Sequence, residues 1–140
     1  GNIGRLAAAT QSRLHLIKPF GFDASDRQLK RPGLDYWPFL DLEIHNSFDG
    51  FTRLFKSGEL AFFSARAQKS YLDLPTSTRG IVFGPETRGL PQEMLEEYRD
   101  CAYQIPIFHS GVRSLNLANA VAIVTYHLLS LKRGSSPKES

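Results

Sequence analysis

The chain alternates short apolar runs that favour β-strands with runs that favour helices, and this alternation constrains its fold more than any other feature. Helix-forming residues fill positions 3–12, and a strand-like run follows until Pro19. The same succession returns along the chain, with strands expected at residues 41–46, 59–65, 79–84 and 103–108 and helices at residues 47–58, 91–100 and 114–132. Strands separated by helices predict an α/β fold, in which helices cover both faces of a mostly parallel sheet.

The length of the chain and the lack of internal boundaries predict one domain. Its 140 residues contain no internal repeat and no linker-like stretch. We therefore expect a single domain over residues 1–132 and a flexible polar tail over residues 133–140.

The expected final helix is apolar on more than one side. A stripe at helical spacing is widened by further apolar residues: Leu117, Val121, Val124, Leu128 and Leu131, then Ala118, Ala122, Ile123 and Leu129. Because the sheet can cover only one of these sides, we expect a second subunit to cover the other, which predicts a homodimer.

Composition narrows the classes of site and partner. The 17 lysines and arginines outnumber the 14 acidic residues, a balance that permits a polyanionic partner. Cys101 is the one cysteine, which excludes an intrachain disulfide and fits a reducing, cytoplasmic location, or an organellar one in a eukaryote. The four histidines lack HxxxH or HExxH spacing, so we expect no metal site. The longest apolar stretch, residues 117–131, is shorter than the roughly 20 residues of a membrane span, so we expect no membrane contact.

Three loops follow expected strands, at the edge where parallel sheets bind ligands: residues 64–68, 84–91 and 107–116. Gly84 and Gly89 let the second loop approach a ligand closely, although a tight strand-to-helix connection explains the same pattern. No GK[ST] follows them and no GxGxxG occurs, which argues against a Walker loop and a dinucleotide fingerprint. Ser114 and Asn116 in the third loop either cap the last helix or face a ligand.

Two further features are typical of contacts with nucleic acid. Arg5 lies one turn into a helix, where the helix dipole disfavours a cation, so it is either a surface arginine or a contact to phosphate or ribose. Basic residues also precede Tyr36, a pattern that suits RNA loops when the aromatic residue is exposed, although a solvated charged turn explains it as well. These basic residues are Arg27, Lys30 and Arg31.

Three segments in order resemble one family. Residues 1–6 (GNIGRL), 81–91 (IVFGPETRGLP) and 105–126 (IPIFHSGVRSLNLANAVAIVTY) are similar to the three motifs of the SPOUT class of RNA methyltransferases, in its SpoU branch of 2'-O-ribose methyltransferases. Residues 14–37 further resemble the members of this branch that methylate the wobble nucleotide of tRNA. The likeness extends from Gly1 to about Leu131.

This resemblance implies features that composition cannot reveal. It implies a deep C-terminal trefoil knot, an exception to the rule that chains do not thread themselves, and a first strand ahead of Gly1 that the sequence does not contain. It also implies S-adenosylmethionine as cofactor, bound in the knot, and a homodimer as the active unit. Carried over by position, the cofactor-binding residues are Phe63, Ser64, Gly84, Glu86, Ile105, Ser114 and Asn116.

The resemblance implies a role for Arg5 as well, because it matches the arginine of the first motif. A guanidinium is a poor general base, so we expect Arg5 to orient the ribose and to stabilise the developing alkoxide. Further RNA contacts are expected at Asn2, Arg27, Lys30, Arg31 and Tyr36.

The leading expectation is therefore a tRNA (cytidine/uridine-34-2'-O)-methyltransferase that acts on the anticodon stem-loop. The alternatives are the same reaction at another tRNA or rRNA ribose, and a non-catalytic RNA-binding protein on the same scaffold.

Overall fold

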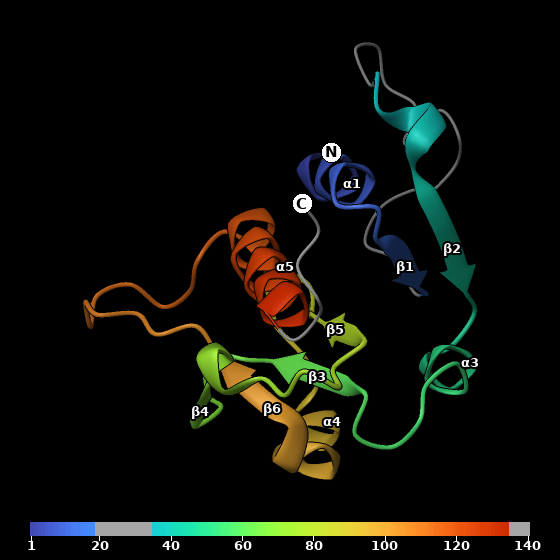
Figure 1. The fold of residues 1–140 in the computed structure, drawn as a ribbon. Coiled ribbons are helices and arrows are strands. Elements are labelled where there is room, and N and C mark those ends of the chain that lie inside the picture. Colours follow the sequence, from blue (N-terminus) through green and yellow to red (C-terminus); the bar gives the residue numbers. More distant parts are fainter. Residues whose placement is uncertain (19–34, 135–140) are drawn as a thin grey trace. The chain divides into compact units, whose positions relative to one another are not determined.

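The computed structural model describes residues 1–18 and 35–134 (Figure 1). Contacts divide the chain into two compact units, residues 1–54 and 55–140. No helix within the described ranges is long and apolar enough to cross a membrane.

The first unit holds a two-stranded parallel sheet and short helices. Its elements are helix α1 (Asn2–Ala9), strand β1 (Arg13–Ile17), the 3-10 turn η1 (Trp37–Phe39), strand β2 (Asp41–His45) and helix α3 (Phe48–Thr52). The two strands pair from Arg13 opposite Asp41 to Ile17 opposite His45. This register brings together segments that are about 30 residues apart in the sequence.

Helix α3 begins where the sequence predicts and ends early. Ser47 caps it, since its Oγ accepts a hydrogen bond from the Gly50 N–H at 3.2 Å. The helix stops at Thr52 rather than reaching residue 58. The Thr52 hydroxyl donates to the Asp49 carbonyl at 3.0 Å, a local bond of the kind that bends or weakens a helix.

The second unit holds a four-stranded parallel sheet. Its elements are strands β3 (Leu60–Phe63), β4 (Lys69–Ser70), β5 (Gly80–Val82) and β6 (Ala102–Gln104), helices α4 (Gln92–Glu97) and α5 (Leu117–Gly134), and the 3-10 turns η2 (Tyr71–Asp73) and η3 (Arg99–Cys101). The strand order is β4-β6-β3-β5, so β3 is central, with β6 on one side and β5 on the other.

Helices cover both faces of this second sheet. Alternate residues of β3 point to opposite faces: Ala61 and Phe63 belong to a buried cluster with Val124 of α5. Phe62 is fully buried on the other face and stacks on Tyr98, just after α4, with ring centroids 4.3 Å apart. Figure 1 accordingly shows α5 on one side of the sheet and α4 on the other.

The parallel α/β architecture predicted from the sequence is confirmed, since every strand pair in the described ranges is parallel. The strands form two sheets rather than one, because β1 and β2 pair only with each other within those ranges. Helix α5 begins at Leu117 rather than Ser114, because the Asn116 side chain caps it. The single domain over residues 1–132 stays a prediction, and the tail from residue 135 onward lies outside the described residues.

Candidate functional site

Three strand ends meet at one edge of the second sheet. Strands β6, β3 and β5 are adjacent and parallel, so the residues that follow them gather at the edge where α/β sheets bind ligands. Ser64 directly follows β3, and Ile105 directly follows β6. Gly84 is separated from the end of β5 by one residue. The Ser64 N–H donates to the Tyr103 carbonyl at 3.0 Å, which fixes the start of its loop against β6.

The loop after β5 folds back on itself closely. A Cβ placed on Gly84 would lie 2.2 Å from the Gly89 carbonyl carbon, so only glycine fits there without moving the loop. Gly89 itself adopts a φ of +68°, and its N–H donates to the Pro85 carbonyl at 2.8 Å. The resulting turn leaves Glu86 exposed.

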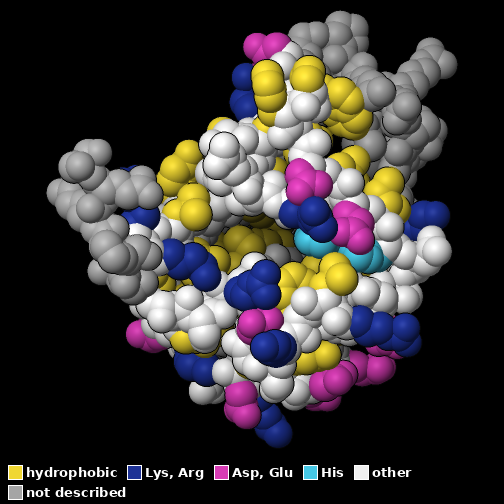
Figure 2. Space-filling model, turned by 45° about the vertical axis from the view of Figure 1, so that its right-hand side comes forward, with side chains coloured by type: hydrophobic (Ala, Val, Ile, Leu, Met, Phe, Trp, Pro, Cys, Tyr) yellow, Lys and Arg dark blue, Asp and Glu magenta, His cyan; other side chains and the backbone are white. Residues whose placement is uncertain are grey.

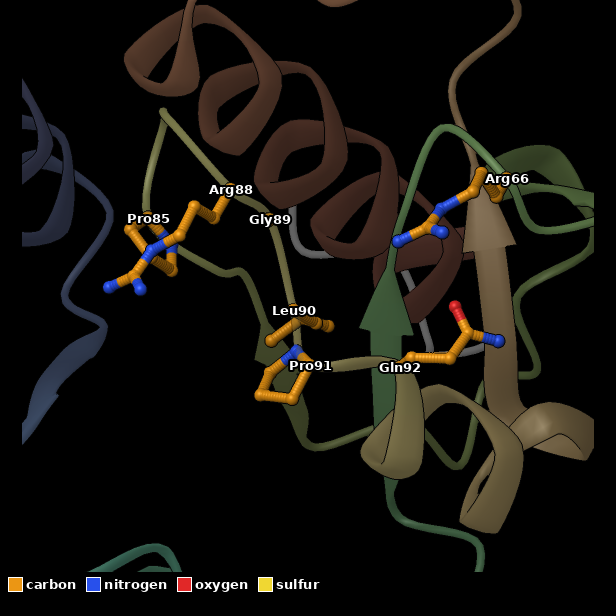
Figure 3. Close-up of a pocket in the computed structure, with 7 residues that line it drawn as sticks. All are labelled: Arg66, Pro85, Arg88, Gly89, Leu90, Pro91 and Gln92. Carbon is orange, nitrogen blue, oxygen red and sulfur yellow. The ribbon is translucent and has the colours of Figure 1, made fainter.

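A pocket of about 380 Å³ lies beside this loop (Figure 3). Its lining comes from the loops after β3 and β5 and from the start of α4: Arg66, Pro85, Arg88, Gly89, Leu90, Pro91 and Gln92. In Figure 3 the Arg66 side chain extends from the loop after β3 towards the segment that contains Leu90, whereas Arg88 extends past Pro85. The pocket thus combines two cations and an amide with apolar walls.

Sequence reasoning missed Arg66, Arg88 and Gln92. Arg66 and Gln92 lie in no recognisable motif, and Arg88 lies in the second motif, where nothing marks its side chain as a ligand contact. A signal was present for the two arginines, since both lie in loops already placed at strand ends, residues 64–68 and 84–91. Gln92 becomes a lining residue because Pro91 occupies the N-cap position of α4 and the helix starts directly at the pocket.

Two of the expected cofactor residues pack in the core. Phe63 is buried and stacks on Phe83, with ring centroids 4.9 Å apart and nearly parallel planes. Ile105 packs against the same cluster. Their side chains therefore support the strand ends from beneath, and neither belongs to the lining of the pocket.

The start of α5 shows the capping arrangement that the sequence left open. The Asn116 Oδ1 accepts hydrogen bonds from the N–H groups of Ala118, at 2.9 Å, and Asn119, at 3.3 Å. Ser114 is exposed two residues earlier. Neither side chain lines the pocket, so their contact with a cofactor stays a prediction.

In the first unit, Arg5 lies over an aromatic ring. Its guanidinium carbon is 5.3 Å from the centroid of the Tyr36 ring, and its Nη1 is 4.0 Å from the Asp35 Oδ1. The Tyr36 hydroxyl donates to the Gly1 carbonyl at 3.0 Å. A Cβ on Gly4 would come within 3.2 Å of the Tyr36 ring, so α1 and Tyr36 pack tightly.

This packing corrects one expectation. Tyr36 is buried, so its ring is not an exposed platform for stacking a base. It supports Arg5 instead, because a cation over the face of an aromatic ring is attracted to it. Asn2 is exposed at the start of α1, whereas Arg27, Lys30 and Arg31 lie outside the described residues.

Comparisons with known proteins agree on one family. The model of the SpoU rRNA Methylase family matches residues 1–126. A putative tRNA (cytidine(34)-2'-O)-methyltransferase from a Synechocystis strain is 46% identical over 132 residues, which cover 90% of this chain and 84% of the relative.

Two solved structures share the fold of this chain. One from a study of the 2-OH methylation of C/U34 on tRNA is 42% identical, with a TM-score of 0.83, covering 95% of this chain and 87% of that one. The SpoU methyltransferase AviRb from Streptomyces viridochromogenes, in complex with AdoMet, shares the fold at 21% identity, with a TM-score of 0.78 over 97% of this chain and 53% of its own.

Proposed function

Because the chain belongs to the SpoU rRNA methylase family, we propose that it transfers a methyl group from S-adenosylmethionine to the ribose 2'-hydroxyl of the wobble nucleotide, cytidine or uridine 34, of tRNA. The observation that carries this proposal is the 46% identity to a relative named for that reaction, over nearly the full chain. The structure that concerns C/U34 methylation supports the same nucleotide. A tRNA substrate favours a cytoplasmic location, or an organellar one in a eukaryote.

The pocket of the second unit fits the chemistry of this cofactor. Its volume lies at the lower end of the range of about 300–1,000 Å³ that is typical of small-molecule sites. Arg66 suits the carboxylate of the methionine moiety, since guanidinium groups bind carboxylates through paired hydrogen bonds. Arg88, whose side chain extends past Pro85, supplies a second cation beside the loop after β5. Gln92 offers both a donor and an acceptor for ribose or adenine, and Leu90 supplies an apolar wall.

The residues of the proposed cofactor site come from all three strand ends. Ser64, Gly84 and Ile105 lie at these strand ends, and Glu86 is an exposed carboxylate on the same loop as Gly84. Phe63 supports these residues from the core. Ser114 and Asn116, before the start of α5, are included in the proposed site because they lie in the third family motif. S-adenosylmethionine supplies a methyl group on a sulfonium that leaves readily, so the main task of the protein is alignment.

Arg5 is the proposed catalytic residue. Its planar guanidinium suits contacts with the phosphate and ribose of nucleotide 34, and it would stabilise negative charge on the 2'-oxygen. Tyr36 and Asp35 restrict where this guanidinium lies. Asn2 on the same helix, together with Arg27, Lys30 and Arg31, completes the proposed contacts with the anticodon stem-loop.

The active unit proposed here is a homodimer with a knotted C-terminal region. Val124 of α5 is buried in the unit, whereas Ile123 is 37% exposed and Tyr126 is 56% exposed, so the helix offers an apolar surface to a partner. The trefoil knot, and a strand ahead of Gly1, rest on the family resemblance and belong to the same proposal.

Methyl transfer with labelled cofactor tests the proposal. Purified protein is incubated with radiolabelled S-adenosylmethionine and total tRNA, and the labelled nucleosides are mapped. We expect 2'-O-methylation at nucleotide 34. A mark at another ribose would establish the related reaction elsewhere in tRNA or rRNA. Failure to bind the cofactor by calorimetry would favour the non-catalytic RNA-binding alternative.

Two arginine variants separate chemistry from binding. Arg5→Ala is expected to lose turnover and to keep its affinity for S-adenosylmethionine. Arg53→Ala, which removes another exposed arginine of the first unit, serves as the control and keeps both. Equal activity of the two variants would remove Arg5 from the catalytic role.

A further inference from the structure

Strands β1 and β2 place two histidines and a glutamate on one face of their sheet. In a strand, alternate residues share a face, so Arg13 and His15 lie on the same side of β1, and Glu43 and His45 on the same side of β2. The parallel register sets His15 opposite Glu43 and Ile17 opposite His45. Residues about 30 positions apart in the sequence therefore become neighbours.

The donor atoms of these three side chains converge. The His15 Nδ1 and the His45 Nε2 are 2.8 Å apart. The same His15 nitrogen is 3.9 Å from the Glu43 Oε2, and the same His45 nitrogen is 3.9 Å from the Glu43 Oε1. Nitrogen and oxygen ligands lie about 2.0–2.2 Å from Zn²⁺, so ligands of one ion are about 3–4 Å apart. The two separations from Glu43 lie in this range, whereas the two imidazole nitrogens are at hydrogen-bond distance and must move slightly apart to bind one ion.

Packing holds the two imidazole rings in place. They stack with centroids 5.1 Å apart, and the buried ring of Phe51 from α3 meets His15 and His45 edge-on at 5.0 and 5.6 Å. Their side chains are only 16% and 8% exposed, whereas Glu43 is 39% exposed. Such restraint lowers the entropic cost of ordering ligands around an ion.

Solvent and charge around the cluster are compatible with entry of a cation. Figure 2 shows histidine side chains at the molecular surface beside acidic and basic ones. The Arg13 Nη1 contacts the Glu43 Oε2 at 3.2 Å, while its Nε donates to the Asp41 Oδ2 at 2.9 Å. Arg13 therefore keeps a carboxylate partner when Glu43 turns towards an ion.

We propose that His15, Glu43 and His45 form a binding site for a divalent transition-metal ion of the Zn²⁺ type, a function separate from methyl transfer. Two imidazole nitrogens and one carboxylate match the preferences of Zn²⁺ and Co²⁺, whereas Mg²⁺ and Ca²⁺ prefer oxygen ligands throughout. In the metal-free protein one histidine donates a hydrogen bond to the other. In the bound state both facing nitrogens present lone pairs, and water completes the coordination.

Such an ion would join β1 to β2 through side chains. It would stabilise the folded first unit, because a ligand that binds only the folded state shifts the unfolding equilibrium by mass action. The absence of HxxxH spacing does not bear on this site, since its ligands come from two strands rather than from one helix.

Metal titration of the full chain after treatment with a chelator tests the proposal. Co²⁺ is added while its visible absorption is recorded, and Zn²⁺ binding is measured by calorimetry. We expect one ion per chain and an increase of the unfolding temperature with Zn²⁺. His45→Gln and Glu43→Gln are expected to weaken binding at least about 10- to 100-fold, the loss already typical when a group that merely supports a metal ligand is removed.

His109→Gln is the matched control, because His109 is an exposed histidine of the second unit and its removal is expected to leave Zn²⁺ affinity unchanged. Circular dichroism of each variant establishes that it folds. If a ligand variant fails to fold, wild-type protein decides: no saturable Zn²⁺ binding, or no rise in its unfolding temperature, overturns the proposal. Equal loss in His109→Gln and in His45→Gln overturns it as well.

Discussion

At the scale of single residues, the contact between Arg5 and Tyr36 gives the catalytic proposal a structural test. Tyr36→Ala removes the ring beneath the guanidinium, and loss of one cation–π contact is expected to lower turnover about tenfold. Tyr36→Phe keeps the ring and is expected to stay close to wild type. Steady-state methylation assays with saturating cofactor measure both variants. Equal turnover of Tyr36→Ala and wild type would show that Tyr36 does not position Arg5.

Gly84 carries the second prediction at this scale. Gly84→Ala forces the loop after β5 away from the Gly89 backbone, so we expect at least about tenfold weaker binding of S-adenosylmethionine and a loss of roughly 1–3 kcal/mol of stability. Gly50→Ala is the control, because its added Cβ meets only the Ser47 Oγ at an ordinary 3.7 Å. Calorimetry and thermal unfolding measure the two effects. Unchanged cofactor affinity in Gly84→Ala would contradict the placement of the site.

His15 gives a prediction for pH. Burial lowers the pKa of His15 below 6.5, and the neighbouring His45 lowers it further, while Glu43 and Asp41 act in the opposite direction and Arg13 adds to the lowering. The unfolded chain therefore binds the proton more readily than the folded one. The contribution of neutral His15 to the free energy of unfolding is therefore present above about pH 6.5, and it is lost as the pH falls towards the pKa of His15 in the folded protein.

Thermal unfolding in a chelator between pH 7.5 and 5.5 measures this effect. We expect the wild-type unfolding temperature to fall more steeply towards acid than that of His15→Gln, which lacks the titrating group. A steeper fall in the variant would contradict the sign of the shift.

At the scale of elements, the first turn of α5 separates capping from binding. Asn116→Ala removes the oxygen that accepts the N–H groups of Ala118 and Asn119, so we expect a loss of about 1 kcal/mol of stability. Ser114→Ala is expected to leave stability unchanged and to weaken S-adenosylmethionine binding. Urea unfolding and calorimetry on both variants test the division. A Ser114→Ala variant with wild-type cofactor affinity would exclude Ser114 from the site.

The exposed side of α5 carries the prediction for assembly. Ile123→Lys and Tyr126→Asp place charges on the apolar surface that the proposed dimer would bury, so we expect monomers by light scattering at micromolar concentration. Ser130→Lys changes an exposed position of the same helix and serves as control. A dimer that persists in both apolar variants would place the interface elsewhere.

Sequence patterns predicted most elements correctly because their signals are local. The alternation of strands and helices, the Ser47 cap and the glycines of the loop after β5 each depend on neighbouring residues. The patterns did not predict the surroundings of a residue where contacts between distant segments determine them. Nothing near Tyr36 shows that α1 covers it, and nothing near His15 shows that β2 brings His45 beside it.

At the scale of the whole molecule, the candidate site also depends on contacts between distant segments that the sequence does not reveal. Loops at strand ends were predictable from the order of elements, and so was the part of the chain that holds the pocket. The side chains that line the pocket were not predictable from this order. Phe63 and Ile105, for example, pack in the core because β3 pairs with β5 and β6. Arg66, from the loop after β3, and Gln92, from the first turn of α4, both line the pocket for the same reason.

The all-parallel pairing also determines how the chain can reach this fold. No strand pairs with its sequence neighbour through a tight hairpin in the described residues: Phe62 pairs with Val82 on one side and with Ala102 on the other. The entropy of closing such long loops is lost before strand pairing contributes any stabilising free energy. This order makes folding slow for a chain of this size. On the ribosome, central strand β3 must wait for both of its partners, so its apolar residues stay open to chaperones until β6 has been synthesised.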